Sequence, residues 1–190
     1  LALRHIFFAE RTATKIPALA DVSLPQINHV AVIGGGTMGA GIAAACLLAD
    51  LAVIMIERDE DALSAGQSRV AEVLSVSRKR GVISAEKHDA IQSRFAGATD
   101  YTALTDSDVV IEAVFEDMDV KKAVFAQLDA ATKPNAILAS NTSYLDIQAI
   151  AQATSDPSRV IGLHFFSPAH IMKLLELIIP DSASPRAVAA

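Results

Sequence analysis

The chain is 190 residues long, 52% hydrophobic and carries a formal net charge of −6. This length can bury one sizeable hydrophobic core, so we expect a single domain with a short extension. The acidic balance argues against a nucleic-acid-binding surface, which needs clustered lysine and arginine, and the single cysteine, Cys46, excludes an internal disulfide bond.

The N-terminal segment differs in character from the rest of the chain. Residues 1–14 carry apolar side chains on successive helical turns, including Leu3 and Ile6, and predict an amphipathic helix. Residues 15–26 contain two prolines and no sustained period, which is typical of a linker. The chain begins at leucine and has no secretory signal pattern. We therefore expect residues 1–25 to be the tail of a preceding domain in a longer, soluble, intracellular protein.

Strands and helices alternate from residue 28 onward. The predicted strands cover residues 29–33, 52–56, 108–114, 136–139 and 159–163, and the predicted helices cover residues 38–50, 59–80, 84–94, 120–131 and 145–153. An uncharged run over residues 30–49 is long enough to cross a membrane, but three consecutive glycines interrupt it, so we expect a strand, a tight turn and a buried helix. This alternation predicts an α/β fold, a Rossmann-type doubly wound, mostly parallel sheet with a helical excursion after the second strand.

A glycine-rich turn joins the first strand of this domain to its first helix. The segment Gly34-Gly35-Gly36-Thr37-Met38-Gly39 has G-x-G-x-x-G spacing. Gly34 permits the tight turn, Gly36 lets the backbone approach a pyrophosphate, and Gly39 allows the helix to pack closely on the strand. The free N–H groups at the helix N-terminus also favour phosphate, so the turn predicts a dinucleotide site.

Glu57 follows the second predicted strand. A carboxylate at this place can accept hydrogen bonds from the adenosine ribose hydroxyls and repels a 2′-phosphate, which favours NAD over NADP. Two alternatives to this role of Glu57 stay open. Arg58 stands beside it and could serve a phosphate, and a glutamate can also simply end a strand in solvent.

Polar residues follow three further apolar segments. Residues 140–143 are Ser-Asn-Thr-Ser, His164 follows the next predicted strand, and Glu176 lies inside the apolar run 172–178. Open α/β sheets bind ligands at the carboxyl ends of their strands. Oxidation of a secondary alcohol with NAD needs a base for the hydroxyl proton, which histidine suits at neutral pH, and a carboxylate can hold its tautomer. We predict that His164 and Glu176 form such a pair, although either residue alone is more often structural.

Four motifs, VAVIGGGTMGAGIA, VIEAVFE, ASNTS and GLHFFSPAHIMKLLE, resemble in this order the NAD-binding domain of 3-hydroxyacyl-CoA dehydrogenases. The leading LRHIFFAER helix and KIP linker resemble the join to an enoyl-CoA hydratase/isomerase domain in multifunctional β-oxidation enzymes. The resemblance implies NAD-dependent oxidation of (S)-3-hydroxyacyl-CoA to 3-ketoacyl-CoA, in the bacterial cytoplasm or a eukaryotic peroxisome. It implies that residues 1–25 belong to the preceding domain and residues 26–190 to the NAD-binding domain, with the C-terminal helical domain absent.

The resemblance also implies roles for individual residues. His164 is implied to be the catalytic base, Glu176 its partner, and Ser143 the group that hydrogen-bonds the substrate's 3-oxygen. The cofactor is implied to contact Gly34, Gly36, Thr37, Met38, Gly39, Glu57, Ala113, Glu116, Lys121 and Asn141. The acyl-CoA is implied to contact Ser143, Asn141, Ser167 and Arg80. Ser167 replaces the asparagine of the mitochondrial enzymes, and the basic run 78–80 that contains Arg80 is more usually a solvated surface.

Two alternatives to this function stay open. The chain by itself could bind NAD(H) without turnover, because the helical domain that closes the site is missing. It could also belong to a related dehydrogenase, such as a 3-hydroxybutyryl-CoA enzyme of another pathway. In each case we expect an acyl-CoA partner, no metal site, no nucleic acid and no membrane.

Overall fold

The computed structural model describes residues 2–13, 16, 19–172 and 174–190. The strands are β1 (His29–Ile33), β2 (Ala52–Ile56), β3 (Phe95–Ala98), β4 (Val109–Glu112), β5 (Ile137–Ser140), β6 (Val160–Phe165) and β7 (Leu175–Ile178). The helices are α1 (Ala2–Ala13), α2 (Thr37–Leu48), α3 (Glu60–Lys79), α4 (Ala85–Gln92), α5 (Met118–Ala131), α6 (Ile147–Ala151) and α7 (Pro185–Ala189), with short 3-10 helices η2 (Tyr101–Leu104) and η3 (Pro157–Arg159).

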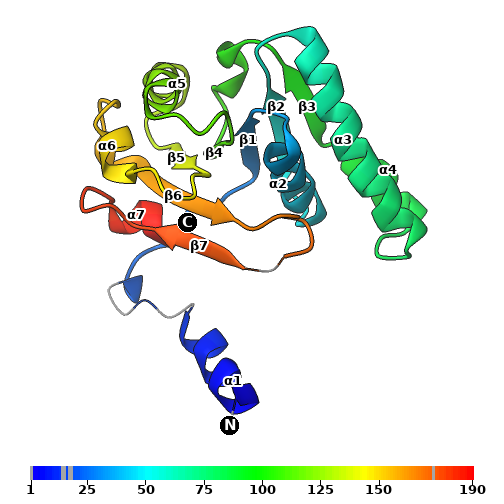
Figure 1. Ribbon diagram of the computed structural model, residues 1–190, viewed down its shortest axis with the longest axis horizontal. Helices are drawn as coiled ribbons and strands as arrows, with labels where there is room; N and C mark the ends of the chain where they lie inside the picture. The colour runs from blue at the N-terminus through cyan, green and yellow to red at the C-terminus, as the bar shows by residue number, and fades with distance from the viewer. Residues whose placement is uncertain (1, 14–15, 17–18, 173) are drawn as a thin grey trace.

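In the described part of the chain, seven strands form one sheet in the order β3-β2-β1-β4-β5-β6-β7 (Figure 1). Neighbouring strands from β3 to β6 run parallel, and β7 runs antiparallel to β6 at the edge. The first strand, β1, lies in the middle of the sheet. β2 and β3 follow on one side of it, and β4 to β7 lie on the other side. The predicted Rossmann-type, mostly parallel sheet is confirmed, and its topological switch point lies between β1 and β4.

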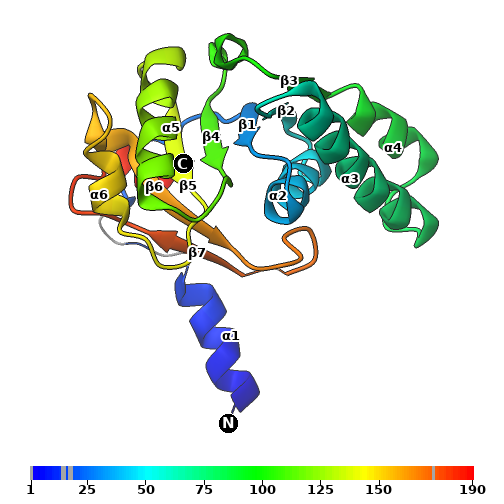
Figure 2. The same ribbon diagram turned by 45° about the horizontal axis from the view of Figure 1, so that its top comes forward.

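Helices cover both faces of the sheet. In Figures 1 and 2, α2 and α3 lie on one face, and α5 and α6 lie on the other. Alternate residues of β1 enter the two hydrophobic clusters: Val30 and Val32 join one, while Ala31 and Ile33 join the other. All four are buried, which explains why this parallel strand is a continuous apolar run rather than an alternating one.

The helix α1 stands apart from the sheet (Figure 2). It confirms the predicted helix over residues 2–13, whereas Leu1 and Thr14, which the prediction included, lie outside the described residues. In the predicted linker, Lys15, Pro17 and Ala18 also lie outside them, and the described residues 16 and 19–26 contain no strand and no α-helix. Apolar side chains of α1 are exposed, Leu3 at 85%.

Several element boundaries differ from the prediction. β3 was missed because its sequence, Phe-Ala-Gly-Ala, has no β-branched residue and follows a helix directly. The strand predicted over residues 108–114 ends at Glu112. The helix predicted from Val120 begins at Met118, because the Asp117 carboxylate caps it by accepting from the Asp119 and Val120 amides.

The helical excursion after the second strand agrees with the prediction. The excursion after β2 consists of α3 and α4, and the Ser84 hydroxyl caps α4 by accepting from the Lys87 amide at 3.1 Å. The run 172–178 contains β7, although Lys173 lies outside the described residues. Among the helices that are described, none is both long and apolar enough to span a bilayer.

Candidate active site

The turn between β1 and α2 depends on its glycines. Gly34 has a φ of +95°, a left-handed conformation, and a Cβ there would lie 2.9 Å from the Ala113 carbonyl oxygen. A Cβ on Gly39 would lie 1.8 Å from the Gly34 carbonyl oxygen, so only glycine allows α2 to start this close to the strand. A Cβ on Gly36, by contrast, would meet no atom within 4 Å. The turn is therefore tightly packed at Gly34 and Gly39 and open at Gly36, where the helix begins.

A cavity of about 980 Å³ opens in front of this turn. It lies where β1, β2 and β4 end, at the topological switch point of the sheet. The residues around it include Gly34, Gly36, Thr37, Met38, Glu57, Arg58, Arg69, Ala113, Val114 and Phe115. Its volume is at the upper end of the roughly 300–1,000 Å³ of small-ligand sites, which suits a ligand as long as a dinucleotide.

Glu57 bonds to the glycine turn as well as lining the cavity. Its Oε1 accepts from the Gly35 amide at 2.6 Å, and its Oε2 accepts from the Arg58 amide at 3.1 Å. The Arg58 guanidinium, whose side chain is 84% exposed, instead pairs with Asp59 at 3.0 Å. The Glu57 carboxylate is therefore bonded to the glycine turn, whereas the Arg58 guanidinium is paired with Asp59.

Arg69 of α3 is a cavity residue that sequence reasoning missed. Its Nη1 donates to the Gly35 carbonyl oxygen at 3.0 Å. Glu57 and Arg69 thus hold the two sides of the Gly35 residue. Nothing in the local sequence distinguishes Arg69 from the other charged residues of the same helix, so only the packing of α3 beside the turn reveals it.

His164 and Glu176 face each other across the β6–β7 pair. The antiparallel register pairs these two residues directly, which places their side chains on the same side of the sheet. His164 Nδ1 lies 2.8 Å from Glu176 Oε2. Because an ionised carboxylate can only accept, this contact favours the neutral tautomer that has its proton on Nδ1 and a free lone pair on Nε2. Glu176 is not a buried residue, since its side chain is 55% exposed on the edge strand.

The loop after β5 brings two more predicted residues to His164. Ser143 Oγ lies 3.4 Å from His164 Nε2. Asn141 Oδ1 accepts from the Phe165 amide at 3.0 Å, which ties the loop to β6 beside the histidine. The nitrogen of His164 that is free to take a proton thus faces a hydroxyl group held on the neighbouring strand end.

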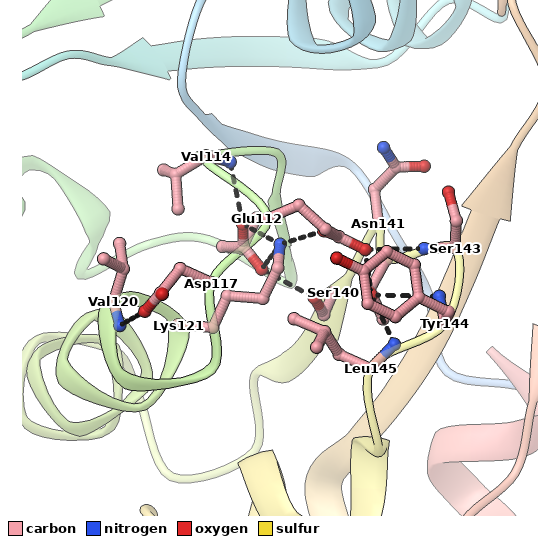
Figure 3. A network of polar contacts seen from close by, with 12 residues as sticks. Glu112, Val114, Asp117, Val120, Lys121, Ser140, Asn141, Ser143, Tyr144 and Leu145 are labelled. Atoms are coloured by element: carbon pink, nitrogen blue, oxygen red, sulfur yellow. Dashed lines mark hydrogen bonds and ion pairs between the residues drawn. The ribbon is translucent and has the colours of Figure 1, made fainter.

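A network of charged residues lies behind this loop (Figure 3). Glu116 Oε1 accepts from the Thr142 hydroxyl and, at 2.9 Å, from the Ser143 amide. Its Oε2 lies 3.2 Å from Lys121 Nζ. Partial burial alone would raise the pKa of Glu116, but the hydrogen bonds from Thr142 and Ser143, together with Lys121, outweigh it and lower the pKa. Glu116 is therefore ionised at neutral pH.

Lys121 does not point into the cavity. Its side chain is 0% exposed, and Nζ also lies 2.7 Å and 2.9 Å from the two oxygens of Glu112. The helical period could have indicated this, since Lys121 shares the buried stripe of α5 with Phe125 and Leu128. A contact of Lys121 with a cofactor stays a prediction, and in this structure its ammonium group contacts the carboxylates of Glu112 and Glu116.

The structure brings most of the predicted site residues to one edge of the sheet, but no described hydrogen bond or ion pair joins Ser167 or Arg80 to them. Ser167 is exposed in the loop between β6 and β7. Arg80 follows the last turn of α3, whose 20 residues correspond to about 30 Å, whereas the first turn of that helix lies at the cavity. The roles predicted for Ser167 and Arg80 toward an acyl-CoA stay predictions.

Comparison with known proteins identifies the family to which this arrangement belongs. Residues 29–190 match the family described as 3-hydroxyacyl-CoA dehydrogenase, NAD binding domain. The chain is 43% identical over 189 residues to the peroxisomal fatty acid beta-oxidation multifunctional protein of Oryza sativa subsp. japonica, with 98% of the chain and 26% of that protein covered. It is 41% identical over 193 residues to the peroxisomal bifunctional enzyme of Homo sapiens, with 99% and 26% covered. The chain thus spans about a quarter of the length of these relatives.

Solved structures show the same fold. M. tuberculosis FadB2 superposes with a TM-score of 0.84 at 38% identity, covering 87% of this chain and 58% of that one. The 3-hydroxybutyryl-CoA dehydrogenase from Escherichia coli superposes with a TM-score of 0.83 at 39% identity, covering 86% and 35%.

Proposed function

The chain belongs to the 3-hydroxyacyl-CoA dehydrogenase family, as its NAD-binding domain, and on that premise we propose that its protein oxidises (S)-3-hydroxyacyl-CoA to 3-ketoacyl-CoA, with His164 as the base. The observation that carries the proposal is the His164–Glu176 pair, with Nδ1 and Oε2 at 2.8 Å and Nε2 turned toward Ser143. Such a pair can take the hydroxyl proton of an alcohol. Its position at the carboxyl edge of the sheet supports this role.

The residues around the cavity fit NAD. The open space in front of Gly36 and the free amides that begin α2 suit a pyrophosphate. Glu57 accepts two hydrogen bonds from the protein, and a carboxylate has about four acceptor sites, so it keeps capacity for ribose hydroxyls. When bound, NAD supplies the acceptor for the hydride that leaves C3 of the substrate.

The chemistry assigned to the protein is the transfer of one proton. Nε2 of His164 accepts the proton of the substrate's 3-hydroxyl group as the C3–H bond breaks, which leaves an imidazolium ion. Glu176 stabilises that cation and holds the ring in the tautomer that leaves Nε2 free. The Ser143 hydroxyl hydrogen-bonds the substrate's 3-oxygen and orients it toward Nε2. In the opposite direction, the imidazolium returns the proton to the oxygen of a 3-ketoacyl-CoA.

We further propose that the chain is one part of a multifunctional protein, peroxisomal if its source is a eukaryote. The names of the relatives and the quarter of their length that the chain spans support this. In this proposal residues 1–25 belong to a preceding hydratase/isomerase domain, and a helical domain follows residue 190. Exposed apolar side chains on α1 and around β7, including Leu174 and Ile179, support neighbours that would cover these surfaces.

One observation favours a second candidate for the chain by itself, a module that binds NAD(H) without turnover. Glu176 and the edge strand that carries it are open to solvent. Charge stabilisation in a solvated site is weaker than in a closed one, so the 190 residues alone would catalyse poorly.

The test is NADH oxidation with acetoacetyl-CoA, measured for the full-length protein and for the 190-residue chain at equal concentration. The proposal predicts rapid turnover in the full-length protein, and NADH binding with little or no turnover in the chain. An inactive full-length protein that still binds NADH would contradict the proposed substrate class.

A further inference from the structure

Glu112, the last residue of β4, is a buried carboxylate to which neither the sequence nor the proposed mechanism assigns a role. Its side chain is 0% exposed. Its oxygens accept from the Val114 amide at 2.7 Å, from the Ser140 hydroxyl at 2.6 Å, and from Lys121 Nζ at 2.7 Å and 2.9 Å (Figure 3). These contacts occupy about all the acceptor sites of a carboxylate, so Glu112 binds no ligand itself.

The buried ion pair between Glu112 and Lys121 is energetically costly. Burying a carboxylate and an ammonium group costs several kcal/mol for each ion, and apolar residues of similar volume often support a fold equally well. A contribution to the stability of the fold is therefore a weak reason for the protein to contain the Glu112–Lys121 pair. What an apolar pair cannot do is direct a third charged group to one place.

That third group is Glu116. Lys121 Nζ lies 3.2 Å from Glu116 Oε2, so its N–H groups are directed at two carboxylates. The other oxygen of Glu116 holds the Ser143 amide at 2.9 Å and the Thr142 hydroxyl. A continuous series of charge-assisted hydrogen bonds thus leads from the end of β4 to the residue that faces His164.

We propose that Glu112 is a positioning residue, which holds Lys121 and Glu116 so that the Thr142–Ser143 loop keeps the Ser143 hydroxyl against His164. This inference rests on the proposed function for the importance of the Ser143–His164 contact. A lysine side chain is free to adopt many rotamers, and the contact of its ammonium group with both Glu112 oxygens removes this freedom before any substrate binds. A displacement of about 1 Å in a catalytic contact can cost roughly 100-fold in rate.

The first variant is Glu112→Gln, which keeps the volume of the side chain. Its amide NH₂ group would take the place of an oxygen that now lies 2.9 Å from Lys121 Nζ, so two donors would meet and the lysine would have to move. In the full-length protein we expect kcat for acetoacetyl-CoA reduction to fall at least tenfold, while KM for NADH changes less than about threefold. In the 190-residue chain we expect the Ser143 amide resonance to shift, because its bond to Glu116 is disturbed.

A second variant separates positioning from folding. Glu112→Met combined with Lys121→Met removes both buried charges together, so neither is left unpaired. We expect this double variant to melt near the wild-type temperature and still to lose kcat and shift the Ser143 amide. The matched control is Asp129→Asn, which weakens the other ion pair of α5, Asp129–Arg159 at 2.5 Å, far along the helix from Ser143. We expect it to lower the melting temperature without changing kcat.

Wild-type kcat and an unmoved Ser143 amide in the double variant would overturn the proposal. So would a loss of kcat that follows the melting temperature equally in Glu112→Gln and Asp129→Asn. The amide measurement needs no turnover, so it decides the positioning claim even if the proposed reaction is wrong.

Discussion

Glu176→Gln is the substitution that examines the catalytic pair most closely. Glutamine has nearly the same shape, but it removes the charge that lies 2.8 Å from His164 Nδ1. Two unit charges 4 Å apart interact by about 4 kcal/mol at an effective dielectric constant of about 20. The Glu176 side chain is 55% exposed, so solvent screens part of this energy and we expect about 1–3 kcal/mol. Since 1.4 kcal/mol corresponds to a factor of ten, kcat should fall roughly 10- to 100-fold.

The assay is steady-state oxidation of NADH with acetoacetyl-CoA in the full-length protein, with kcat and both KM values measured. In the proposed mechanism Glu176 acts on the imidazolium that forms during the reaction, so the loss should lie in kcat and not in the KM for NADH. Glu176→Asp keeps the charge on a shorter side chain and should recover part of the rate. A kcat for Glu176→Gln within about twofold of wild type would refute the reasoning.

Three further predictions concern the cofactor site and stability. Glu57→Ala should weaken NAD binding and narrow the preference over NADP in fluorescence titrations; unchanged selectivity would remove Glu57 from the ribose site. Gly39→Ala should abolish NADH binding or folding, because its Cβ would lie 1.8 Å from the Gly34 carbonyl oxygen, and normal binding would contradict the geometry of the turn. Burial alone would raise the pKa of Asp108, but Lys133 and the amides of residues 28 and 29 outweigh it and lower the pKa to about 2. The ionised Asp108 carboxylate therefore stabilises the native state above pH 4, and about 1–2 kcal/mol of this stability is lost as the pH falls from 4 toward 2. Urea denaturation at these pH values should show this loss for the wild type and not for Asp108→Asn.

The elements that the sequence predicted are those with strong local signals. The Val and Ile runs of β1 and β2, and the glycines between β1 and α2, each have one structural interpretation that fits. β3 escaped detection because Phe-Ala-Gly-Ala becomes a strand only by pairing with β2. Tertiary context overrode local propensity there.

The site shows the same division between local and tertiary signals. His164 and Glu176 could be paired from their chemistry, and the β6–β7 register then supplied the contact. Glu112 and Arg69 could not be identified, because a charged residue at a strand end or on a helix is usually solvated. The helical period could indicate that Lys121 is buried, but only the folded structure reveals that its ammonium group meets the buried Glu112 carboxylate.

The proposed base is tested most directly by the rate of acetoacetyl-CoA reduction in full-length His164→Ala, beside His29→Ala, a change at an exposed histidine that begins the central strand β1. General base catalysis contributes typically 10²- to 10⁴-fold, so we expect kcat to fall at least about 100-fold for His164→Ala. We expect unchanged NADH affinity in both variants and a normal rate for His29→Ala. A rate for His164→Ala close to that of the wild type would contradict the assignment of His164 as the base.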